Sequence, residues 1–157
     1  MTDGWPQDWE RRKAGEGCLL CNSVGQGDND LHLIVTQLEL TEIRLKRRSL
    51  LPGYCMAIWR HRHVADLMDL DDDELRGFSR EVVRLAKAID QVFQPVKINY
   101  FTLGNWVPHL HTHVVPRYLD DPAPGNPITW SDMFKPEPNE PALLERQAQD
   151  LRQILLG

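Results

Sequence analysis

The alternation of apolar and polar residues predicts strands in the first third of the chain. Within Leu31–Leu45, β-branched and aliphatic residues are interleaved with polar ones, which indicates two short strands with a break near Gln37. After the turn signal Pro52-Gly53, the run Tyr54–Trp59 is continuously apolar, which is typical of a strand buried on both faces. We therefore expect a sheet in which this third strand is central.

The middle of the chain has a clear helical pattern. The acidic stretch Asp71–Glu74 supplies an N-cap residue, an acid three residues later, and negative charge where the helix dipole favours it. Apolar residues then recur at steps of three and four up to Pro95, namely Leu75, Phe78, Val82, Leu85, Ala86, Ile89 and Phe93. This pattern predicts one long amphipathic helix.

The last third of the chain predicts a hairpin, a long connection and a terminal helix. Lys97–Leu103 and Val107–Val115 are expected to pair antiparallel around the turn Gly104-Asn105. Seven of the 11 prolines lie in residues 116–141, a connection without periodic structure for which Trp130, Met133 and Phe134 are the expected anchors. Helical spacing returns at about 141–156, so the order of elements predicts an α+β fold with a mainly antiparallel sheet.

Length and composition narrow the class of protein. A chain of 157 residues is expected to form one domain, with a core at about 18–118. The formal charge of −5 disfavours binding to a nucleic acid polymer. No apolar run is long enough for a signal peptide or a membrane span, and the odd number of cysteines, three, favours a reducing compartment. We therefore expect a cytoplasmic protein that does not contact a membrane.

Three of the six histidines, His109, His111 and His113, lie within five residues. On a strand they would all point to one face, while the apolar residues between them bury the other, so we expect an open histidine face. Two kinds of chemistry fit that arrangement. The imidazoles can converge on a metal ion, or the middle histidine can act as a nucleophile whose tautomer its neighbours set.

The flanking residues point to a particular family. The segment Gly104–Tyr118 resembles the signature of the histidine triad (HIT) family, in which three histidines alternate with apolar residues. The resemblance extends back through Pro52-Gly53-Tyr54 and His63, and covers roughly residues 18–118. It implies a HIT-like fold, a homodimer, and a nucleotidyl hydrolase or transferase. Such an enzyme acts at the α-phosphate of phosphoanhydrides or phosphoramidates, for example dinucleoside polyphosphates or nucleoside phosphoramidates.

The resemblance also implies roles for individual residues. His111 would become covalently nucleotidylated, with a backbone carbonyl holding its tautomer, and His113 would contact the scissile phosphate and the leaving group. Asn105 is a candidate donor to the phosphate, and Asn99 is a weaker one. Three positions depart from the family pattern, of which Thr112, in place of a usually apolar residue, is a small change. Trp106 stands where relatives often carry Ser or Thr that assists the leaving group, and Lys46 stands where relatives carry an Asp or Asn that holds the ribose, although lysine accepts no hydrogen bond.

A second pattern, Cys18-x-x-Cys21, has several interpretations by itself: free thiols, a redox pair or half of a metal site. The family resemblance implies a structural zinc in which His63 and the first triad histidine, His109, complete four ligands. His32 and His61 are rival ligands, but the ordinary interpretation of each is a surface imidazole. Cys55 is expected to be a small buried hydrophobe in the central strand.

Two alternatives to a nucleotidyl-histidine enzyme stay open at this point. One is a hydrolase whose catalytic metal is held by His109, His111 and His113. The other is a noncatalytic protein that binds a nucleotide or a partner, which the intact middle histidine makes less favourable.

Overall fold

The computed structural model describes residues 4–157. Five strands form one sheet in the spatial order β1-β2-β3-β5-β4, with every neighbouring pair antiparallel. The strands are β1 (His32–Gln37), β2 (Thr41–Lys46), β3 (Cys55–Trp59), β4 (Lys97–Thr102) and β5 (His111–Arg117). The helices are α1 (Trp9–Lys13), α2 (Leu19–Ser23), α3 (Asp72–Phe93), α4 (Trp130–Met133) and α5 (Pro141–Leu156), with a 3-10 turn at Leu67–Asp69.

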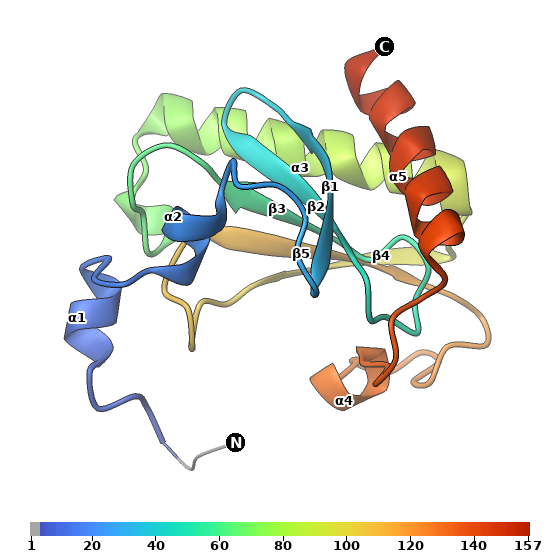
Figure 1. Ribbon diagram of the computed structural model, residues 1–157, viewed down its shortest axis with the longest axis horizontal. Coiled ribbons are helices and arrows are strands. Elements are labelled where there is room, and N and C mark those ends of the chain that lie inside the picture. The colour runs from blue at the N-terminus through green and yellow to red at the C-terminus, as the bar shows by residue number, and fades with distance from the viewer. Residues whose placement is uncertain (1–3) are drawn as a thin grey trace.

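Helices α3 and α5 cover one face of the sheet, and Figure 1 shows α1 and α5 at opposite ends of the molecule. The core between sheet and helices buries the apolar stripe of α3 against alternate residues of the strands, including Ile43, Ala57 and Val114. At roughly 25 cal/mol per Å² of apolar surface, this burial is the main stabilising contribution. The predicted α+β fold with an antiparallel sheet is confirmed.

The start of α3 is set by local chemistry, as the acidic stretch predicts. The carboxylate of Asp71 accepts hydrogen bonds from the backbone N–H groups of Asp73 and Glu74, and the Glu74 carboxylate accepts one from the N–H of Asp71. This capping box satisfies donors that the first helical turn would otherwise leave free. The helix ends at Gln94, which adopts a left-handed conformation (φ 49°) just before Pro95.

The histidine-bearing strand begins later than the sequence pattern suggests. We expected a strand from Val107, but β5 starts at His111, and His109 precedes it. Pro108 has no N–H to contribute to a ladder, and the N–H of His109 bonds back to the carbonyl of Val107 (2.8 Å) in a tight turn. His109 is therefore released from the strand and its side chain turns toward the N-terminal segment.

The other face of β5 is covered rather than open. The proline-rich connection folds back over it, and Met133 and Ile128 are buried there against Tyr54 and Val115. Of the three expected anchors, only Met133 is deeply buried, since Trp130 is half-exposed and the side chain of Phe134 lies outside. Consequently His111 and His113 are only 8% and 5% exposed, which corrects the expected open face.

Candidate functional site

The hydrogen bond that organises the site joins His111 to its own chain. Its Nδ1 lies 2.6 Å from the backbone carbonyl oxygen of His109. Because a carbonyl only accepts, the proton resides on Nδ1, and Nε2 is left with its lone pair. Burial lowers the pKa of His111, which favours this neutral form. An imidazole so held has the electronic form of a nucleophile.

His113 lies beside His111, with ring centroids 4.9 Å apart. Its Nδ1 is 2.8 Å from the hydroxyl of Tyr54. Burial, reinforced by the proximity of His111 and the charge of Lys46, lowers the pKa of His113 to about 2, so this ring is neutral at pH 7. Burial raises the pKa of Tyr54, so its hydroxyl keeps its proton and, when it donates to Nδ1, leaves an N–H at Nε2 of His113.

A cavity of about 240 Å³ opens next to the two histidines. Its lining includes Asn105 and Trp106 from the loop before β5, and Trp130 from α4. The Trp130 ring stands edge-on to His113 at 4.8 Å between centroids. The sequence pattern predicts Trp130 only as an anchor of the connection. Its place in the cavity lining could not be predicted, because no local pattern relates it to a histidine 17 positions earlier.

Asn99 lies outside this cavity. Its Oδ1 accepts a hydrogen bond from Arg117 (2.8 Å), and it lines a different cavity of about 550 Å³ beyond β4. The register between β4 and β5 explains this placement. Phe101 is the residue opposite His113, and Asn99 is opposite Val115, two positions farther along the strand pair. The structure thus brings Asn105 and Trp106 to the histidines and leaves Asn99 apart.

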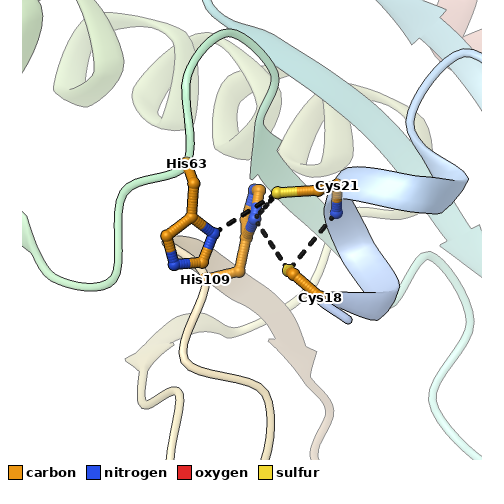
Figure 2. Close-up of side chains that lie close together, drawn as sticks. All are labelled: Cys18, Cys21, His63 and His109. Carbon is orange, nitrogen blue, oxygen red and sulfur yellow. Dashed lines mark hydrogen bonds between the residues drawn. The ribbon is translucent and has the colours of Figure 1, made fainter. Parts of the chain in front are cut away.

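The second cluster unites the residues of the Cys-x-x-Cys pattern with two histidines (Figure 2). Nδ1 of His109 lies 3.4 Å from Sγ of Cys18 and 3.3 Å from Sγ of Cys21, and Nδ1 of His63 lies 3.3 Å from Sγ of Cys21. The four ligand atoms are all within 4.8 Å of one another. Zinc bonds of about 2.3 Å to sulfur and 2.0 to 2.1 Å to nitrogen place such atoms about 3.6 Å apart in a tetrahedron.

Backbone carbonyls orient both imidazoles of the cluster. Nε2 of His109 lies 2.7 Å from the carbonyl of Trp59, and Nε2 of His63 lies 3.1 Å from the carbonyl of Lys13. Each carbonyl accepts a hydrogen bond from the N–H at Nε2, so Nδ1 keeps its lone pair directed at the cysteines. Partners outside the ligand shell fix the tautomer of metal-binding histidines in the same way. The donor set and its orientation therefore fit a metal ion. Among residues 4–157, no comparable ligand group includes His111 or His113, so the alternative of a metal held by the whole triad has no support in this arrangement.

Of the expectations for the remaining histidines and cysteine, those for Cys55 and His61 agree with the structure and that for His32 does not. Cys55 is fully buried in β3, as expected, and His61 is exposed. The prediction of a surface position for His32 is wrong, since it is only 7% exposed. It lies on the first strand of the sheet, where the alternation pattern alone does not reveal what covers it.

Gly15, in the N-terminal segment, packs closely against the ring of His63, one of the four residues of the Cys/His cluster. Gly15 has φ +88°, and a Cβ there would come within 2.9 Å of Cγ of His63. We expect Gly15→Ala to lower the free energy of unfolding by about 2 to 4 kcal/mol, combining left-handed strain with displacement of the His63 ring. Gly17→Ala is the matched control, because Gly17 has φ +65° with nothing within 4 Å of the added Cβ. Denaturant unfolding of both variants tests this, and equal losses would contradict the role of the His63 contact.

The fold and the site together define an α+β protein with a buried histidine pair beside a Cys/His cluster of metal-binding type. The sequence model of the HIT domain matches residues 28–120, more than half of the chain. The chain belongs to the histidine triad family. No helix within the described residues has the length and apolar character needed to cross a membrane.

Curated relatives and solved structures agree with this assignment. The chain is 32% identical over 126 residues to a bis(5'-nucleosyl)-tetraphosphatase [asymmetrical] of Schizosaccharomyces pombe, covering 74% of this chain and 67% of that protein. It is 30% identical to an AP-4-A phosphorylase of Mycobacterium tuberculosis, over 62% of this chain but only 53% of the phosphorylase. A histidine triad protein of Bradyrhizobium japonicum shares the fold with a TM-score of 0.71, at 22% identity over 80% of this chain and 92% of the other. A Zn-bound histidine triad family protein of Mycobacterium smegmatis also shares the fold, with a TM-score of 0.63 and 21% identity over 88% of this chain and 93% of the other.

Proposed function

We propose that this chain is a nucleotidyl hydrolase or transferase that cleaves at the α-phosphate of a small nucleotide conjugate through a covalent intermediate on His111. The observation that carries the proposal is the 2.6 Å hydrogen bond from Nδ1 of His111 to the carbonyl of His109, which leaves the Nε2 lone pair free in a ring that lines the cavity. The names of two relatives, a tetraphosphatase and a phosphorylase, support a dinucleoside polyphosphate as substrate.

The reaction follows in two displacements. Nε2 of His111 attacks the α-phosphorus, the new N–P bond forms, and the bond to the bridging oxygen or nitrogen breaks with its electron pair leaving on that atom. The leaving group takes up a proton, and water or phosphate then displaces the imidazole to release the nucleotide. His113, neutral and bonded to Tyr54, supports this chemistry as a donor to a phosphate oxygen through Nε2.

The cavity suggests how the substrate is positioned. Asn105 lines it as a candidate donor to the phosphate, and Trp106 and Trp130 offer two half-exposed indoles beside the histidines. An indole has a flat apolar face and a single N–H donor, so these side chains favour an aromatic group such as a nucleobase over a compact leaving group.

We also propose that Cys18, Cys21, His63 and His109 hold a structural zinc ion. Four protein ligands leave no coordination position for substrate, so the metal would stabilise the fold. The metal site and the candidate nucleophile share one residue. Nδ1 of His109 faces the cysteines, and the backbone carbonyl of His109 accepts the hydrogen bond from His111. Cysteines that hold zinc and are not joined in a disulfide favour a reducing, cytoplasmic location. We propose the family's homodimer for this chain as well.

Direct detection of the intermediate tests the proposed function. The protein is mixed with dinucleoside polyphosphates, nucleoside phosphoramidates and nucleotide sugars, quenched at short times, and digested for mass spectrometry. We expect a nucleotidyl adduct on the peptide that contains His111 with at least one of these substrates. Turnover without an adduct on any histidine, or neither turnover nor adduct across the panel, would contradict the proposal.

A further inference from the structure

Two polar side chains lie next to each other at one end of the histidine-bearing face. His32 of β1 is directly opposite Lys46 of β2 in the antiparallel register. Nζ of Lys46 is 5.8 Å from the centroid of the Tyr54 ring, whose hydroxyl contacts His113. A continuous row of side chains therefore leads from Lys46 through Tyr54 to the triad histidines, on the face opposite to α3 and α5.

Both side chains have unused capacity to bind a ligand. His32 is 7% exposed, yet its Nε2 has no hydrogen-bond partner within residues 4–157. A buried polar nitrogen without a partner is unfavourable in a folded protein, so this atom has the capacity to bond a further group such as a ligand. Lys46 is half-buried and forms no ion pair with any carboxylate of the described residues.

The surrounding charges leave this end of the face positive. The other buried cation on β2, Arg44, is neutralised by Glu42, which it contacts through two guanidinium nitrogens. Burial lowers the pKa of Lys46, and no neighbouring carboxylate offsets that effect. Burial, with a smaller contribution from the Lys46 charge, lowers the pKa of both His32 and His113, so both rings are neutral at pH 7. An anion placed here would supply the opposite charge that no carboxylate of the described residues gives to Lys46.

We propose that Lys46 and His32 form an anion subsite for a second phosphate carried by the ribose of the substrate. The inference rests on the proposed function, which places the α-phosphate at His111; a sugar that extends from there along the row would bring its own phosphate to Lys46. A lysine ammonium cannot accept hydrogen bonds from a ribose diol, whereas a phosphate monoester accepts charge-assisted bonds from an ammonium and a bond from an imidazole N–H. The substrate class is therefore a nucleotide conjugate phosphorylated at the 2′ or 3′ position.

Calorimetric titration of the full chain tests the subsite with three probes that lack a leaving group: AMP, adenosine 2′,5′-bisphosphate and adenosine 3′,5′-bisphosphate. We expect one bisphosphate to bind about 10- to 100-fold more tightly than AMP. Lys46→Met is expected to abolish this preference and Lys46→Arg to retain most of it. His32→Leu should reduce the preference, and His32→Gln, which restores a donor, should recover part of it.

Lys87→Met is the matched control, since Lys87 is an exposed residue of α3 on the opposite side of the sheet and its loss changes the net charge equally. The preference should survive in that variant. Equal affinities for AMP and both bisphosphates, or a preference that persists in Lys46→Met, would overturn the subsite while leaving the proposed function intact. Absence of binding by all three probes together with no adduct on His111 would remove both.

Discussion

His111→Asn is expected to lower the turnover of a cleaved substrate by about 10⁴-fold or more, because the variant has no imidazole nitrogen to attack phosphorus. Asparagine is smaller than histidine, but its amide N–H can replace Nδ1 as the donor to the carbonyl of His109, so the fold should persist. Single-turnover rates measure the chemical step, and calorimetry with AMP measures binding separately. We expect the Kd to change by no more than about threefold.

His61→Asn is the control for this prediction. It makes the same replacement at an exposed imidazole, whose Nε2 bonds to the carbonyl of Glu39 and which lies in neither cluster. Its turnover should match that of the natural chain. If His111→Asn retained more than about one per cent of the activity, a loss below roughly 2.7 kcal/mol in transition-state stabilisation, the assignment of His111 as nucleophile would fail.

Removal of the proposed zinc ion is expected to have the second large effect, a loss of stability. Ligand binding to the folded state alone contributes about 4 kcal/mol when free zinc exceeds its Kd a thousandfold. For a chain of this length such a loss lowers Tm by roughly 8 to 16 °C. Cys18→Ala removes one buried sulfur ligand and should produce this shift without chelator, with less than one zinc per chain by elemental analysis.

Cys55→Ala separates the loss of a ligand from the loss of a thiol. Cys55 is fully buried in β3 and does not belong to the cluster, so this variant should lose some core packing but keep one zinc per chain and its sensitivity to chelator. A purified chain that contains no zinc, and whose Tm a strong chelator leaves unchanged in the presence and absence of added zinc, would contradict the metal proposal.

The zinc experiment also distinguishes the two metal hypotheses. A structural ion held by Cys18, Cys21, His63 and His109 supports catalysis only through the position of the His109 carbonyl, so activity at low temperature should follow the folded fraction. A catalytic ion held by the triad would instead be lost with all activity while the chain stays folded. The direction of the Nδ1 atom of His111, toward a carbonyl of its own chain, favours the first outcome.

Local chemistry was sufficient to predict the long helix and the order of the strands, although not the start of β5, and the resemblance of one short segment indicated the family. The capping box at Asp71 and the three- and four-residue spacing that follows it depend only on neighbours within the helix, which is why α3 begins where the pattern indicates. The sequence also indicated the candidate nucleophile, because His111 and its neighbouring histidines alternate with other residues in one short segment. The two cysteines and two histidines of the cluster came instead from the family resemblance, since those residues are up to 91 positions apart.

Only the tertiary structure decided the surroundings of these residues. The burial of His32 depends on what lies over β1, the separation of Asn99 depends on the register between β4 and β5, and the contact of Trp130 with His113 depends on the path of a proline-rich connection. Spacing along the chain specifies which face a side chain occupies, whereas these outcomes are set by packing between segments remote in sequence. The sequence by itself therefore determined the elements and which histidines share a face, and long-range packing determined which side chains surround those histidines and which of their polar atoms have no partner among the described residues.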